Sequence, residues 1–461
     1  MDPERPSPTD RRGTQRGART VRRAEALWRE IPRLAGLAFP LIAGLTASTL
    51  NGIIDTVMLG PLGEVPLAVV SLSTSGLSIL YAGLYGFMGP VGIFAGHAHG
   101  AGDDPRVAAA LGHGRLLGGV AGLIATGLMI AALPMLRFMG QPEAVLEAMP
   151  GYWLCIAASM APFTVMLAYK QVYDGVERPW LAMILMLFGE ALNVPLNWIL
   201  IYGHLGAPAL GVTGAGVASL LSSLVALAIL AGHWQWSQAT APYRAQSRIT
   251  RAGAADQMRE GAPMAAQYLL EGSAFAIAGL MVGWFGATAL AANQIVTAVT
   301  FVIYMAPLGM SAAVSIRVAQ ALGRGARDRA GAIGWAAIAL VTAWMGLFTL
   351  VLTFFGQTIA GLFIDDRDVI ALAASLFTIV AVMQIFDGIQ STSLGALRGL
   401  MDNRWPTVVT LVAYWGVALP TSYLFGVDLG WGTNGDRAGY GQRETLAATA
   451  LTWRFHVLTT R

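Results

Sequence analysis

Residues 369–397 read VIALAASLFTIVAVMQIFDGIQSTSLGAL, an apolar run with one ionisable side chain, Asp387, near its middle. A helix needs about 20 apolar residues to cross the roughly 30 Å of hydrocarbon in a bilayer, so this run is long enough to span a membrane. A carboxylate at mid-membrane depth costs about 2.5 to 3.5 kcal/mol on insertion scales, and ionisable residues kept at such depth mark functional sites. The stretch therefore predicts a membrane helix, and its aspartate predicts a site.

The composition of the whole chain agrees with a membrane protein. Of its 461 residues, 55% are hydrophobic and 12% are charged, whereas soluble domains carry about 25% charged residues. The net charge of +3 is too small to indicate a nucleic-acid partner. The single cysteine, Cys155, excludes an internal disulfide and a cysteine metal cluster.

Apolar stretches of spanning length recur along the chain, and we predict an all-α membrane protein with twelve transmembrane helices. Arg-rich connections alternate with acidic or uncharged ones, which by the positive-inside rule places both termini in the cytoplasm. Residues 1–33 contain no apolar core of a signal peptide and are predicted to form a disordered basic cytoplasmic tail. The predicted spans are 35–60, 66–95, 107–136, 148–170, 180–203, 211–236, 262–286, 289–316, 331–360, 369–397, 406–427 and, weakly, 445–458.

The two halves of the chain resemble each other, which predicts two pseudo-symmetric six-helix lobes. They are an N lobe, residues 34–237, and a C lobe, residues 261–461, joined by a cytoplasmic linker at 238–260. Because each repeat has an even number of spans, both copies keep the same orientation and a binding site is expected between them. A shift of 223 residues aligns Pro40 with Pro263, Tyr81 with Tyr304, Gly86 with Gly309, Gly100 with Gly323 and Gly102 with Gly325.

Four carboxylic acids are predicted well inside the spans, and no Lys or Arg is expected at comparable depth. Groups of one sign cannot neutralise one another, so each acid must be protonated, bind a cation or face a watery cavity. The alternative is that each acid only hydrogen-bonds across the bundle in its neutral form. The four are Asp55, Glu190, Glu271 and Asp387.

Amide side chains accompany these acids. Glu190, Asn193 and Asn197 share one helical face, and Pro195 should bend the helix and free carbonyls beside the two Asn. Such oxygens suit a hard cation such as sodium, although Asn can also serve only to join helices. In the second half, Gln384 and Gln390 flank Asp387, and Gln267 lies one turn before Glu271.

Two other motifs do not support a different chemistry. Residues 96–104, GHAHGAGDD, hold His and Asp, but an H-x-H pair aims both rings one way only on a strand, and a helix end is predicted here. Residues 214–219, GAGVAS, lack the strand and the Lys of a nucleotide-binding loop, so close helix packing explains them better. No Ser/His/Asp or Cys/His arrangement occurs, and we expect neither an enzyme nor a cofactor or resident metal.

In order and spacing, the segments resemble the multidrug and toxic compound extrusion (MATE) family, and within it the NorM-type branch. The resemblance covers residues 35 to 427. It is carried by FPLIAGLTASTLNGIIDTVMLGPLG at 39–63, HGAGD at 99–103, MGQPEAV at 139–145, LNVPLNWILIYG at 192–203, LLEGSAFA at 269–276, SIRVAQALGRG at 315–325 and FDGIQSTSLGALRGLMDNRWP at 386–406.

The resemblance implies a V-shaped antiporter of the bacterial inner membrane, a monomer surrounded by lipid. It would export lipophilic organic cations in exchange for sodium ions or protons. Asp55, Asn193 and Asn197 match the family's N-lobe cation site, and Glu271 and Asp387 match the C-lobe site of the NorM branch. Two positions depart from the pattern: Met383 stands where some members have Tyr, and Glu190 is an additional acid.

The largest departure is at the start of the twelfth span, where residues 434–444 read NGDRAGYGQRE. The apolar run that remains, 445–457, is about 20 Å long at 1.5 Å per residue, too short to cross unaided. Either the bilayer thins, or the charges snorkel to the outer face, or this end of the chain folds poorly. The charges at issue are Asp436, Arg437, Arg443 and Glu444.

Two other functions are alternatives to cation-coupled efflux. A lipid or polyprenyl-phosphate flippase of the same broad superfamily would need Arg or Lys deep in the cavity to hold an anionic headgroup. A membrane scaffold without transport does not account for four unpaired acids at depth. The sign of the charge in the cavity therefore discriminates between efflux and lipid transport.

Overall fold

The computed structural model describes residues 30–46, 52–244 and 249–460, and within these ranges the chain is all helical, with no strand. Ten helices are long and apolar enough to cross a membrane, and Gly52–Leu62 is a shorter apolar helix. Together with residues 30–46, this short helix takes the place of the first predicted span. The twelfth is the last helix, which falls outside the ten.

The helices of the first half follow the predicted spans. The chain passes from residues 30–46 and 52–59 through η1 (Gly60–Leu62) to five long helices, with the short helices η2 (Leu133–Met139), η3 (His204–Gly206) and η4 (Gln238–Arg244) in the connections. The long helices are α2 (Glu64–Gly100), α3 (Asp104–Ala132), α4 (Glu143–Gly175), α5 (Pro179–Tyr202) and α6 (Val212–Trp236).

The second half repeats this order. The eleventh span is one rod made of α11 (Arg404–Leu411), η5 (Val412–Ala418), α12 (Leu419–Tyr423) and η6 (Leu424–Asp428), of which η5 and η6 are π-helical. The long helices are α7 (Arg251–Gly283), α8 (Ala287–Gly323), α9 (Arg327–Gly361), α10 (Arg367–Gly399) and α13 (Gly432–Thr460).

The backbone carries the duplication that the sequence predicted. α2 and α8 have the same length, 37 residues, and both start after a glycine with positive φ, Gly63 at 103° and Gly286 at 99°. The turns that follow them also match, because Gly102 and Gly325 both have φ of 70°. A left-handed backbone of this kind is readily available only to glycine, so these residues set equivalent turns in the two lobes.

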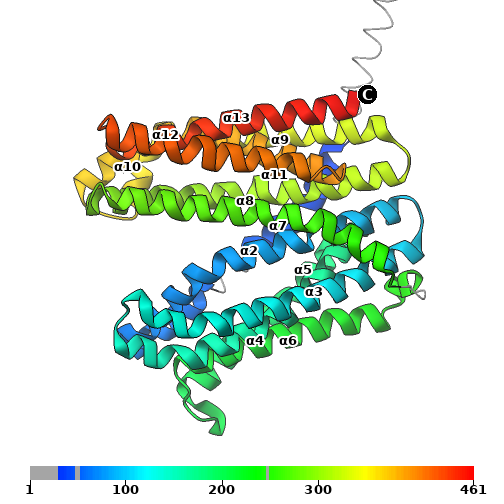
Figure 1. Cartoon of the computed structure of the whole chain (residues 1–461), viewed down its shortest axis with the longest axis horizontal. Helices are drawn as coiled ribbons and strands as arrows, with labels where there is room; N and C mark the ends of the chain where they lie inside the picture. The colour runs from blue at the N-terminus through cyan, green and yellow to red at the C-terminus, as the bar shows by residue number, and fades with distance from the viewer. Residues whose placement is uncertain (1–29, 47–51, 245–248, 461) are drawn as a thin grey trace, which may run out of the picture.

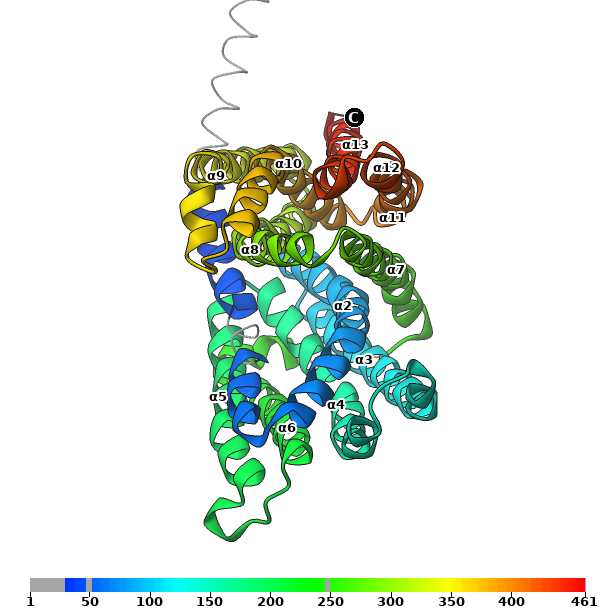
Figure 2. The same ribbon diagram turned by 90° about the vertical axis from the view of Figure 1, so that its left-hand side faces the viewer.

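The helices form two bundles that lie side by side (Figure 1). α2 to α6 make up one bundle and α8 to α13 the other, while α7 runs along the seam in contact with α2 (Figures 1 and 2). The bundles converge at the right-hand side of Figure 1, where the α2–α3 and α8–α9 turns lie.

Contacts between backbones hold the converging end together. A side chain on Gly100 would collide with the backbone of Gln320, and one on Gly323 with the backbone of His97. Gln320 also donates from Nε2 to the carbonyl oxygen of Gly175 at 2.9 Å. The two lobes therefore touch at this end through α2, α4 and α8.

Ion pairs close the same end. The guanidinium of Arg317 on α8 contacts the carboxylates of Glu177 at 2.8 Å and of Glu30 at 3.0 Å. Arg329 on α9 contacts Glu30 at 2.6 Å. The first helix also packs on the C lobe, since Leu34, Leu37, Ala38 and Leu41 join the core cluster of α8, α9 and α10.

Two predicted boundaries are corrected by these contacts. Residues 30–33 of the predicted tail are helical, and Glu30 is buried because two arginines of the C lobe satisfy its carboxylate. Residues 251–260 of the predicted linker belong to α7, whose first turn is capped by the Thr250 hydroxyl accepting from the amide of Gly253 at 3.1 Å. The rest of the tail, residues 1–29, lies outside the described residues.

The last helix is longer than its apolar run. α13 has 29 residues, about 43 Å at 1.5 Å per residue, and so has the length to cross a bilayer. Arg443 is 1% exposed and Glu444 is 8% exposed, so neither charge snorkels to an outer surface. Of the three expected outcomes, the structure contradicts snorkelling for these two residues, because both charges are paired inside the lobe.

Candidate functional site

Three predicted residues meet in the N lobe. Asn197 donates from Nδ2 to Asp55 Oδ1 at 2.6 Å and to Asn193 Oδ1 at 2.7 Å. Asn193 and Asn197 lie one turn apart on α5, and the helix that precedes α2 brings Asp55 against them. We call Asp55, Asn193 and Asn197 the N-lobe cluster.

The N-lobe cluster offers oxygen atoms to a cation. Asn197 is fully buried and its Oδ1 has no hydrogen-bond partner in the described chain. A buried acceptor without a partner costs about 1–3 kcal/mol, and a hard cation prefers carboxylate and amide oxygens of this kind. With the Asp55 carboxylate beside it, the cluster has the donor set and charge of a monovalent cation site.

The other residues of α5 extend the same face. Asn193 Nδ2 reaches Ser219 Oγ on α6 at 3.5 Å, a long contact. Glu190 is half-buried and makes no hydrogen bond or ion pair with any described residue. It lies one turn from Asn193, so it adds a further acid near the cluster without being held by it. α5 continues through Pro195 to Tyr202.

The predicted C-lobe acids also come together, with a third acid beside them. Tyr414 on η5 donates from its hydroxyl to Glu271 Oε1 at 2.7 Å. Asp387 on α10 lies within electrostatic range of Glu271, and Glu444 on α13 lies within electrostatic range of Asp387. We call Glu271, Asp387 and Glu444 the C-lobe acid cluster.

A cation lies against this cluster, contrary to the expectation that no Lys or Arg reaches such depth. The Arg443 guanidinium carbon lies 3.9 Å from the centre of the Tyr414 ring and 5.0 Å from that of Phe275. Arg443 Nη2 contacts Glu444 Oε1 at 3.2 Å, and the charge of Arg443 acts on Asp387. The interior charge of the C lobe is therefore partly neutralised by the chain itself.

The three predicted glutamines have other partners. Gln267 accepts at Oε1 from Arg398 Nη2 at 3.1 Å, so it serves this arginine. Gln384 donates to the carbonyl oxygen of Thr300 at a long 3.4 Å. Gln390 makes a 3.5 Å contact from its Nε2 to the hydroxyl of Tyr414, the residue that donates to Glu271 of the acid cluster.

Sequence reasoning missed two aromatic residues beside the C-lobe acid cluster and one buried ion pair in the N lobe. Phe275 and Tyr414 lie in apolar spans, where an aromatic residue gives no signal of a site. The ion pair joins Lys170 and Asp174, which both lie on α4, and their Nζ and Oδ2 atoms lie 2.6 Å apart. Their spacing of one helical turn was a usable signal for a buried ion pair.

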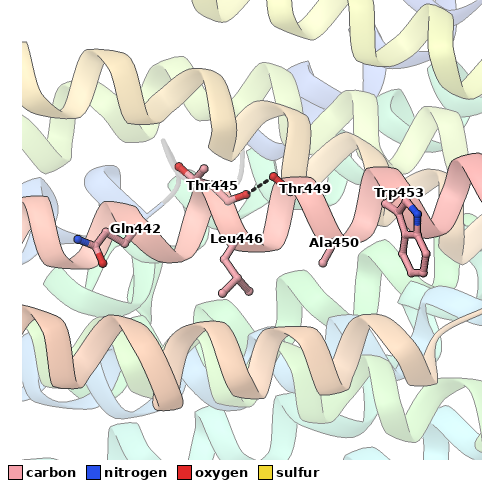
Figure 3. A pocket seen from close by; sticks show the side chains of 6 residues that line it. All are labelled: Gln442, Thr445, Leu446, Thr449, Ala450 and Trp453. Carbon is pink, nitrogen blue, oxygen red and sulfur yellow. Dashed lines mark hydrogen bonds between the residues drawn. The ribbon is translucent and has the colours of Figure 1, made fainter.

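Two hollows lie outside both clusters. A cavity of about 40 Å³ between the lobes is lined by side chains that include Tyr85, Gln171, Tyr268 and Arg398. A shallow groove of about 630 Å³ runs along α13 and is lined by Gln442, Thr445, Leu446, Thr449, Ala450 and Trp453; in Figure 3 Leu446, Ala450 and Trp453 point to one side of the helix. None of these six residues is ionisable.

Comparison with known proteins gives one consistent result. A family model described as MatE matches residues 40–199 and 263–424. A probable multidrug resistance protein NorM of a Synechococcus species is 31% identical over 446 residues, which cover 93% of this chain and 94% of the relative. The multidrug resistance protein NorM of Burkholderia vietnamiensis is 31% identical over 455 residues, 96% of this chain and 97% of that protein.

Solved structures show the same fold. The eukaryotic MATE transporter AtDTX14 superposes with a TM-score of 0.83 at 19% identity, covering 94% of this chain and 98% of its own. The Vibrio cholerae MATE transporter VcmN in its bent form gives a TM-score of 0.83 at 22% identity, with 95% and 98% covered.

Proposed function

Because the chain belongs to the multidrug and toxic compound extrusion family, we propose that it is a cation-coupled antiporter that exports organic cations in exchange for sodium ions or protons. Multidrug efflux by a multi-pass membrane protein follows from the NorM relatives. The coupling ion and the coupling site are the parts that we propose. The observation that supports both is the N-lobe cluster, which combines the Asp55 carboxylate with the buried Asn197 Oδ1 that has no hydrogen-bond partner in the described chain.

Charge asymmetry supports an orientation. The end at which the lobes converge carries Arg106, Arg178, Arg324 and Arg327 in its connections, and positively charged connections favour the cytoplasm. In this orientation both termini are cytoplasmic, in the inner membrane of a bacterium, and the state described here is closed to the cytoplasm. The N lobe, residues 34–237, and the C lobe, residues 261–461, then move against each other to expose the site alternately.

The mechanism is competition for one charge site. An organic cation enters from the cytoplasm or the inner leaflet and is held by carboxylates, adaptable Met side chains and aromatic faces. An external sodium ion or proton then neutralises Asp55, and the organic cation loses its counter-charge and leaves. With one ion exchanged for one monovalent drug the electrical work cancels, so the concentration gradient of the ion drives export. Each further inward charge adds about 2.3 kcal/mol per 100 mV.

The test is uptake of a fluorescent organic cation by everted vesicles that contain the chain in its lipid bilayer. We expect uptake to follow an imposed sodium or proton gradient and to be lost in Asp55→Asn at equal expression. Glu64→Gln, which removes an exposed acid at the start of α2, is the matched control and should transport normally. Full transport by Asp55→Asn would contradict a coupling role for the N-lobe cluster.

A second candidate, transport of an anionic lipid, is favoured by one observation. Arg398 lines the cavity between the lobes and has no acidic partner in the described ranges. A guanidinium so placed can bind a phosphate. Loss of transport of a labelled anionic lipid, but not of the organic cation, in Arg398→Gln would support this alternative over drug efflux.

A further inference from the structure

We propose that Arg443 is a built-in cation that occupies the C-lobe acid cluster and keeps it closed to sodium, so that the coupling ion binds only at the N-lobe cluster. The inference rests on the proposed function for the identity of the coupling site. It assigns to Arg443 a role in ion specificity, and it reduces the number of exchangeable cation sites in each chain to one.

The surroundings of Arg443 are those of a cation site that is already filled. Its guanidinium lies over the Tyr414 ring at 3.9 Å and near the Phe275 ring at 5.0 Å, and its Nη2 contacts Glu444 at 3.2 Å. Aromatic faces attract cations most strongly where water is excluded, and Arg443 is 1% exposed. Two aromatic rings and an acid therefore hold one buried positive charge.

The Tyr414 ring links this cation to the rest of the acid cluster. The ring faces Arg443, while its hydroxyl donates to Glu271 at 2.7 Å. α10, which carries Asp387, packs against α13, where Gly441 lies against Met383, one turn before Asp387. A sodium ion on Glu271 would thus lie beside the Tyr414 side chain, whose ring already faces a fixed positive charge, in a region of low dielectric constant where repulsion between like charges is strong.

Arg443 cannot be exchanged as a free ion can. An arginine keeps its proton at all relevant pH values, and this one is tethered to α13, which packs closely on its neighbours. A Cβ on Gly439 would lie 2.6 Å from backbone atoms of Thr421 and Ser422, and Gly441 has no room for one beside Met383. Because it is tethered, the guanidinium has a high effective concentration beside the acids. A free sodium ion would have to displace it to bind there.

The N lobe offers the contrasting case. The Asp55 carboxylate has Asn197 as its hydrogen-bond partner and no Lys or Arg partner in the described chain. Asn197 Oδ1 is still unpartnered. A mobile cation is therefore needed at the N-lobe cluster, whereas the C-lobe acid cluster already contains one.

The test is the number of radioactive sodium ions bound by the purified full-length protein. Arg443→Gln should bind one more sodium ion than the wild type, and this gain should disappear when Asp387→Asn is added. In the wild-type background, Asp387→Asn should leave sodium binding unchanged. Arg443→Lys keeps the charge and should gain no site. Arg437→Gln, which removes another arginine of α13, is the matched control and should also gain none.

The outcomes separate this inference from the proposed function. No gain in Arg443→Gln, or loss of wild-type sodium binding in Asp387→Asn, would overturn the role of Arg443. Sodium binding that is insensitive to Asp55→Asn would instead contradict the proposed N-lobe site. The gain is a difference from the wild type, so it is informative even if the N-lobe cluster prefers protons.

A second measurement covers a variant that folds poorly. Arg443→Ala leaves a space of guanidinium shape, so guanidinium ion at low millimolar concentration should raise its melting temperature and leave that of the wild type unchanged. Equal responses of the two proteins, or none in the variant, would show that Arg443 does not fill a cation site.

Discussion

At the scale of single residues, Asn197 is the amide on which the N-lobe cluster depends. Its Nδ2 holds both Asp55 and Asn193, and its Oδ1 is the free acceptor. We expect Asn197→Ala to weaken ion binding at least tenfold, since a hydrogen bond to a charged group contributes about 1.5–3 kcal/mol. Ion titration of transport measures this effect. Ser219→Ala, which removes only a 3.5 Å contact to Asn193, should bind ions normally.

Tyr414 has two functions that substitutions can separate. Tyr414→Phe removes the hydrogen bond to Glu271 and keeps the ring beside Arg443, so we expect a loss of about 1.5–3 kcal/mol of stability. Tyr414→Ala also removes the aromatic face and leaves a cavity, and should cost more. Unfolding in detergent followed by circular dichroism compares the two. Equal stability of both variants would show that the ring does not hold Arg443.

At the scale of helices, the packing of α13 depends on small residues that let backbones approach. Gly439→Ala places a Cβ 2.6 Å from backbone atoms of Thr421, which cannot rotate away. We expect a loss of about 1–3 kcal/mol. Gly346→Ala on α9, where a Cβ would meet nothing within 4 Å, is the control and should be neutral or stabilising by up to about 1 kcal/mol. Melting temperatures measured in one detergent decide between these expectations.

At the scale of the whole molecule, the ion pairs of Glu30 connect the first helix to the C lobe at the closed end. We expect Glu30→Gln to shift the population toward a state opened at this end, because Arg317 and Arg329 lose their shared carboxylate. Spin labels at exposed positions 106 and 328 measure the separation, in a background without Cys155. An unchanged distance distribution would show that these pairs do not govern closure.

The same pairs predict a dependence on pH. Glu30 precedes the first predicted span; burial by itself raises the pKa of its carboxyl, but hydrogen bonds and charge from Arg317 and Arg329 outweigh burial and hold this pKa below its ordinary value. A lowered pKa means that the pairs contribute to closure above the ordinary pKa and lose this contribution as the pH falls through the lowered value. The label distance should therefore increase on acidification in the wild type, and Glu30→Gln should not respond.

Much of the fold could be predicted because its signals are local. The length of each apolar run gives a span, and the duplication predicts equivalent turns, which the matching φ angles of Gly102 and Gly325 confirm. The first predicted span contacts both lobes, since residues 34–41 pack on the C lobe while Asp55 meets α5 of the N lobe. Contacts of this kind depend on how helices are placed, which hydropathy does not report.

The sequence by itself determined that this protein is a two-lobe membrane bundle with acids at depth, because apolar length, loop charge and internal repeats are properties of short segments. Only the tertiary structure decided which side chains surround Asp55, Glu271 and Glu444. Asp55 and Asn197 are distant in sequence, as are Tyr414 and Arg443, and both pairs are brought together by helix packing. The energy of a charge at depth depends on its neighbours in space, so a C-terminal segment that looked unsuited to a membrane supplies a cation to the C-lobe acids.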